Sequence, residues 1–68
     1  MGVRDQIRCF VEAMPPNDAE RFVREVVELV MLPNGFTLAK DRVRREADRL
    51  RVPLSPLACA SFVNTLSP

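Results

Sequence analysis

The sequence predicts a small all-α protein, a compact bundle of about four short helices. Apolar side chains recur at steps of three and four residues in four separate segments, which is the periodicity of amphipathic helices. Prolines or a proline–glycine turn separate these segments. The composition, 47% hydrophobic and 28% charged, is typical of a folded chain and not of a disordered one. The 68 residues suffice for one domain, which we expect to span 1–68.

The first helix is expected at residues 3–14. Its apolar side chains fall on one face at helical spacing: Val3, Ile7, Phe10, Val11 and Met14. Pro15 and Pro16 then end the helix, because neither has an N–H to donate and each restricts the residue before it.

The second helix is expected at residues 18–32, with Asn17 as its N-cap and Glu20 three residues later, close to a capping box. A broad apolar stripe follows helical spacing: Ala19, Phe22, Val23, Val26, Val27 and Val30. The last turn, residues 29–32, is apolar on all sides, so we expect it to be buried on several sides.

The third helix is expected at residues 38–51. A turn at residues 33–35, Pro-Asn-Gly, precedes it, and Thr37 is the expected N-cap. Its inward face is thin and contains two alanines: Ala39, Val43, Ala47 and Leu50. Most other positions are charged, with six basic against three acidic residues between 38 and 51.

The fourth helix is expected at residues 56–66, after Ser55 as N-cap and Pro56 at the first helical position. No charged side chain occurs between residues 52 and 68. A helix that is apolar nearly all round is normally buried, so one interpretation puts this helix at the centre of the bundle. The other is that one face closes the domain while another meets a partner, because exposed apolar patches mark interaction sites.

The fourth helix and the end of the second contain more apolar side chains than one small domain can readily bury. This excess leads to the first functional hypothesis, a non-catalytic protein–protein interaction or dimerisation module. The partner would be another protein or a second copy of the chain, since symmetric pairs are the commonest soluble oligomers. The predicted contact residues come from the fourth helix and the end of the second: Leu29, Met31, Leu57, Phe62, Val63 and Leu66.

The alternative hypothesis is a small helix-turn-helix-like DNA-binding regulator that uses the basic third helix. Its candidate nucleic-acid contacts are Arg42, Arg44, Arg45 and Arg49. The competing interpretation is a solvated helix face on which nearby acids neutralise the arginines, which is the usual role of such charge runs. Because the pattern is weak and the whole chain carries a net charge of only +1, nucleic acid is not the favoured partner.

The residue inventory predicts no enzyme, no cofactor, no metal site and no small-molecule substrate. Histidine is absent, and two cysteines alone do not complete a zinc site. Cys9 and Cys59 have apolar neighbours and are expected to be buried thiols, with a disulfide as the alternative. We find no leader sequence and no apolar run of membrane-spanning length, so the expected setting is intracellular and cytoplasmic, without a membrane partner.

Overall fold

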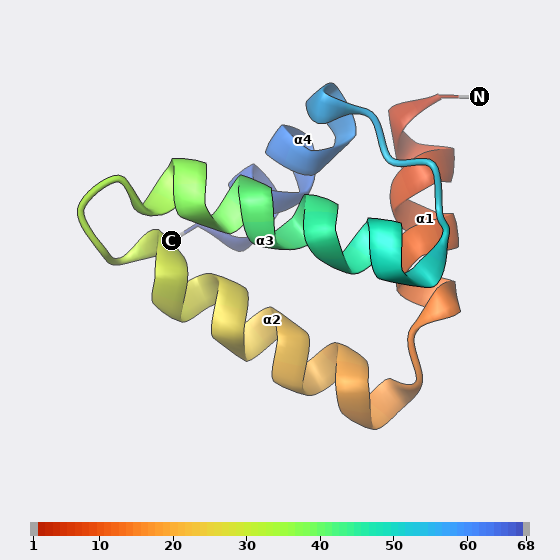
Figure 1. Cartoon of the computed structure of the whole chain (residues 1–68), viewed down its shortest axis with the longest axis horizontal. Helices are drawn as coiled ribbons and strands as arrows, with labels where there is room; N and C mark the ends of the chain where they lie inside the picture. The colour runs from red at the N-terminus through yellow and green to blue at the C-terminus, as the bar shows by residue number, and fades with distance from the viewer. Residues whose placement is uncertain (1, 68) are drawn as a thin grey trace.

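The computed structural model describes residues 2–67 and consists of four α-helices (Figure 1). They are α1 (Val3–Ala13), α2 (Pro16–Val30), α3 (Gly35–Leu50) and α4 (Pro56–Leu66). Helices α2 and α3 run side by side in opposite directions, and α1 crosses the end of this hairpin that is remote from the α2–α3 turn. No strand occurs within residues 2–67, so the prediction of a small all-α bundle of four helices is confirmed.

The helix boundaries agree with the sequence prediction for α4 and differ for the other three. Helix α1 ends one residue early, at Ala13. Helix α2 begins at Pro16 with Pro15 as N-cap, so Asn17 is not the cap; proline suits a first helical position because its missing N–H has no partner there. Helix α2 also ends at Val30, two residues before the predicted end.

Helix α3 begins a turn earlier than predicted, at Gly35, with Asn34 and not Thr37 as its N-cap residue. Asn34 adopts a left-handed conformation, φ 61°, which asparagine tolerates better than most residues. A Cβ on Gly35 would lie only 2.3 Å from the carbonyl oxygen of Leu29 and 2.4 Å from that of Val30. Because these are backbone atoms, only glycine allows α3 to start this close to the end of α2.

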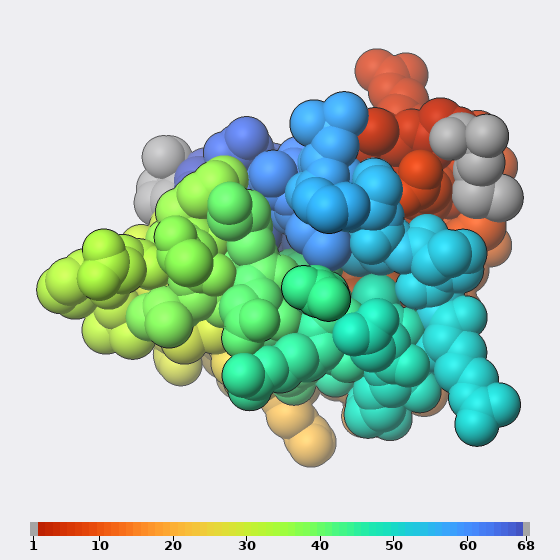
Figure 2. Space-filling model, turned by 45° about the horizontal axis from the view of Figure 1, so that its top comes forward, coloured from red at the N-terminus to blue at the C-terminus, as the bar shows by residue number. Residues whose placement is uncertain are grey.

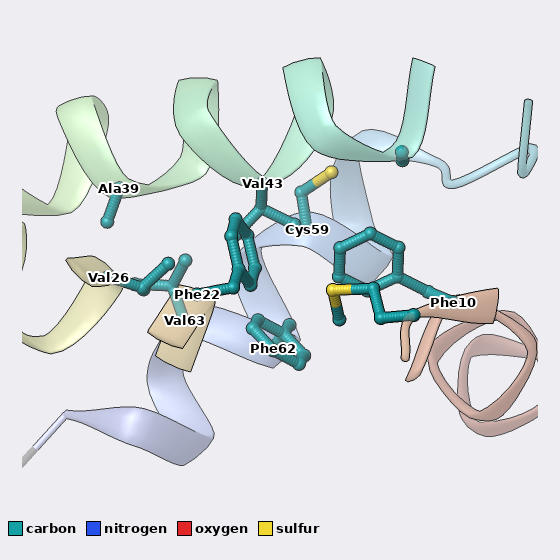
Figure 3. Close-up of a cluster of buried hydrophobic side chains, with 10 residues drawn as sticks. Phe10, Phe22, Val26, Ala39, Val43, Cys59, Phe62 and Val63 are labelled. Carbon is teal, nitrogen blue, oxygen red and sulfur yellow. The ribbon is translucent and has the colours of Figure 1, made fainter. Parts of the chain in front are cut away.

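Three phenylalanine rings lie at the centre of the core, one each from α1, α2 and α4 (Figure 3). Phe10 packs edge-on against both Phe22 and Phe62, with ring centroids 5.7 and 5.5 Å apart. These edge-to-face arrangements are the favoured geometry for aromatic pairs. Helix α3 completes the core with small and β-branched side chains. Of its predicted inward residues, Ala39, Val43 and Ala47 are buried and Leu50 is half-buried.

Helix α4 packs against all three other helices. Its side chains Phe62 and Val63 are buried, and Ala58 and Cys59 are buried with them. The interpretation that puts this helix at the centre of the bundle therefore accounts for most of its apolar character. Ser55 caps the helix as predicted, because its Oγ accepts a hydrogen bond from the backbone N–H of Ala58 at 3.1 Å.

Candidate functional site

Large apolar side chains are exposed mainly at the turn that joins α2 to α3. Six such side chains are exposed within residues 2–67, and four of them belong to residues 31–38: Met31, Leu32, Phe36 and Leu38. Met31 is 72% exposed and Leu32 is 51% exposed. Both follow the end of α2, and the close start of α3 at Gly35 leaves them outside the bundle.

The residues that form this exposed region are uncharged, and Lys40 borders it with its ammonium 4.8 Å from the centre of the Phe36 ring. Residues 29–39 form an uninterrupted uncharged run, and the C-terminal end of α4 lies beside the α2–α3 turn in Figures 1 and 2. Residues 64–67 of that end are also uncharged. We call residues 29–39 and 64–67 together the uncharged end of the molecule.

The structure separates the six predicted partner-binding residues into three groups. Met31 is exposed in the uncharged end, where Leu29 and Leu66 are half-buried. Leu57 is 68% exposed but lies at the opposite end of α4.

Phe62 and Val63 are core residues, so their predicted role in a partner surface is corrected. The lack of charge in α4 predicts a partner surface, whereas three neighbouring helices pack against this helix. Leu32, Phe36 and Leu38 were missed as exposed residues. The signal that would have found them is the unbroken uncharged run across the predicted turn.

Arg42, one of the four predicted nucleic-acid contacts, is engaged within the protein. Its guanidinium binds Glu25 of α2 with Nε 2.9 Å from Oε1, and it donates to Glu46 at 3.0 Å. The same guanidinium lies 5.0 Å from the centre of the Phe22 ring. The hydrogen bond to Glu25 is the main cause that raises the pKa of Arg42. Arg42 therefore joins α3 to α2, and a phosphate would have to displace two carboxylates.

Two further predicted contacts also have carboxylate partners. The Nε of Arg45 is 3.0 Å from Oδ2 of Asp41, and Arg49 pairs with Glu46. Arg44 alone among the four predicted arginines forms no ion pair within residues 2–67.

A hollow of about 240 Å³ lies between α2 and α3 and contains equal numbers of opposite charges. Three guanidiniums and three carboxylates line it, together with Phe22: Arg21, Arg42, Arg49, Asp18, Glu25 and Glu46. Balanced charge of this kind does not attract a polyanion, because Arg42 and Arg49 are already paired with carboxylates.

In Figure 1, α2 and α3 run in opposite directions from the turn that joins them and diverge toward their other ends. A helix-turn-helix needs a second helix whose side chains are free to enter the major groove, whereas Arg42, Arg45 and Arg49 of α3 are already paired with carboxylates.

A cleft of about 510 Å³ lies between α3 and the start of α4. Its lining residues combine two cations, a carboxylate, an apolar wall and a thiol: Lys40, Arg44, Asp41, Leu54, Pro56 and Cys59. The boundary between α3 and the beginning of α4 is on the face turned toward the viewer in Figure 2.

The two cysteines are free thiols in different environments. Cys59 is buried, as predicted, and burial raises the pKa of its thiol while nearby Arg44 opposes that rise. Cys9 is exposed, so the prediction that it is buried was wrong. Its neighbour Phe10 points into the core, and the next position along a helix is rotated by about 100°.

Within residues 2–67 no cluster of three or more side chains suitable as metal ligands is present. No helix in this part of the chain is both long enough and apolar enough to cross a membrane. Comparison with protein-family models, curated proteins and solved structures finds no match to this chain.

Proposed function

We propose that this chain is a non-catalytic protein–protein interaction module that associates with a second copy of itself through the uncharged end. The observation that carries the proposal is the concentration of exposed apolar side chains in residues 31–38. Clusters of this kind on a small domain are typical of interaction surfaces.

The absence of charge favours a second copy as the partner. In a two-fold symmetric contact the same surface is present on both sides, so any charge on it meets its own copy or must be paired. A surface without charged side chains avoids like-charge repulsion and the desolvation of ions. Homodimer interfaces are also more apolar than the average protein surface.

The required contact area is modest for this molecule. A specific interface buries at least about 1,000 Å² in total, or roughly 500 Å² on each copy. That is about a tenth of the 4745 Å² that the chain exposes. The tight turn at Gly35 supplies a preorganised backbone, which reduces the entropy lost on binding.

The test is multi-angle light scattering of the purified chain over a concentration series. We expect a dimer whose dissociation constant rises at least about tenfold in Met31→Asp and in Leu38→Asp, because each change buries a carboxylate on both sides of the contact. Leu57→Asp is the matched control, since Leu57 is similarly exposed but lies outside the uncharged end.

A chain that stays monomeric at every concentration would refute the proposal. So would a dimer that Leu57→Asp weakens as much as Met31→Asp does. Circular dichroism of each variant confirms that the helices remain folded.

A further inference from the structure

The cleft between α3 and the start of α4 has unneutralised positive charge. Among residues 2–67, neither Lys40 nor Arg44 forms an ion pair or a side-chain hydrogen bond. The carboxylate in the cleft, Asp41, is already bound to Arg45 at 3.0 Å. The cleft is therefore positive, in contrast to the balanced hollow between α2 and α3.

The two cations have a defined spacing. Lys40 and Arg44 are four residues apart on α3, so their side chains project from the same face about one helical turn apart. The ammonium of Lys40 lies 4.8 Å from the centre of the Phe36 ring, which contributes no formal charge to neutralise it. Two carboxylates spaced by one helical turn on a partner would match this pair.

The remaining walls favour an apolar side chain next to those carboxylates. Leu54 and Pro56 line the cleft, and α4 begins at Pro56, so the positive end of its dipole is directed there. A second hollow of about 380 Å³, lined by Gln6, Pro53, Leu54 and Ser55, shares Leu54 with the cleft. Shared walls of this kind suit an extended ligand more than a small one.

We infer that this cleft is a docking site for an acidic segment of a partner protein, with Lys40 and Arg44 binding two carboxylates and Leu54 and Pro56 contacting an apolar side chain between them. The cleft adjoins the uncharged end, because Lys40 packs over the Phe36 ring, but acidic-peptide binding there does not depend on self-association. A dimer of this chain could then bind an additional protein at the cleft of each copy.

The test is a phage-displayed random-peptide selection against the immobilised 68-residue chain. We expect enriched peptides to share two acidic residues and a large apolar residue. Their affinity should fall at least about tenfold for the Lys40→Gln/Arg44→Gln double variant, because each loses a charge-assisted contact. Arg24→Gln is the control, since it removes one exposed positive charge from α2, outside the cleft.

Three outcomes would overturn the inference. The first is the absence of enrichment, and the second is a set of peptides that bind the double variant and the unchanged chain equally. The third is duplex DNA binding that needs Lys40 and Arg44 while no acidic peptide does, which would assign the cations to phosphate.

A further variant separates the two proposals. Met31→Asp should weaken self-association and leave peptide binding unchanged. Peptide binding by a monomeric chain would refute only the proposed dimer, and a dimer without acidic-peptide binding would refute only the cleft.

Discussion

Glu46 shows how a charged residue from a basic helix becomes part of the folded structure. It is 6% exposed, and its carboxylate accepts hydrogen bonds from Arg49 and Arg42. The hydrogen bond from Arg49, with that from Arg42, lowers the pKa of Glu46 below its ordinary value of 4.5, although burial opposes the shift. Through Arg42 the same network reaches Glu25 on α2, so it stabilises the hairpin.

Glu46→Gln should therefore reduce the free energy of unfolding by about 1–2 kcal/mol at neutral pH, because it weakens charge-assisted hydrogen bonds to a buried group. A carboxyl whose folded-state pKa is depressed stabilises the fold above its unfolded pKa and loses that effect as pH falls through the folded pKa. The difference between the two proteins should thus be constant above about pH 5 and shrink below pH 4.5. Urea titrations at several pH values measure it.

The matched control for this prediction is Glu20→Gln. Glu20 pairs with Arg24 at 3.5 Å, and both side chains are largely exposed. Its loss should cost less than about 0.5 kcal/mol, as for most surface ion pairs. Equal effects of the two substitutions at neutral pH would contradict the structural role of Glu46.

At the scale of elements, the α2–α3 turn determines which apolar residues reach the surface. Residues 31–34 lie outside both helices, and α3 begins at Gly35 against the carbonyl oxygens of Leu29 and Val30. The Gly35 N–H donates to the Leu32 carbonyl oxygen at 2.8 Å, which closes the turn. Helix α2 therefore stops before the apolar Met31 and Leu32, and both are exposed.

Gly35→Ala should destabilise the fold by roughly 3 kcal/mol, because the added methyl group clashes with backbone atoms that cannot move independently. Thermal unfolding followed by circular dichroism measures the loss. Gly2→Ala is the control, since a Cβ added there would lie 3.8 Å from a side-chain oxygen of Asp5, an ordinary contact distance. A Gly35→Ala protein as stable as the unchanged chain would disprove the close approach of α3 to α2.

At the scale of the whole molecule, the charged side chains are unevenly distributed along the chain. Residues 29–39 and 52–68 contain no charged side chain, so all nineteen charged side chains, ten basic and nine acidic, come from the remaining segments. The uncharged end contains the proposed self-association surface, and the α3–α4 cleft contains two unpaired cations. The two proposed contacts therefore depend on different forces.

Salt should distinguish these forces. Raising sodium chloride from about 50 to about 500 mM should leave the dimer dissociation constant unchanged or slightly lower, because apolar contacts are not screened. The same change should weaken acidic-peptide binding several-fold, because the Debye length shortens. Light scattering and fluorescence anisotropy measure the two constants. Dissociation of the dimer by salt would contradict an uncharged interface.

The sequence by itself determined the all-α class, the four helices and the exact bounds of α4. These follow from local information: helical periodicity, prolines that cannot continue a helix, and the Ser55–Pro56 start signal. It also identified the buried face of α3, formed by Ala39, Val43 and Ala47. These small and apolar residues share one face of an otherwise charged helix, so only that face can pack against the core.

Only the tertiary structure decided which apolar and charged residues remain available at the surface. Phe62 and Met31 are both apolar, yet Phe62 is 6% exposed and packs against Phe10 and Phe22, whereas Met31 is 72% exposed. Arg44 and Arg42 are two residues apart, yet only Arg42 meets Glu25 from another helix. Whether a side chain is free to bind a partner depends on packing and ion pairing with residues distant in the chain. The periodicity within one segment does not show which distant residues will be its neighbours.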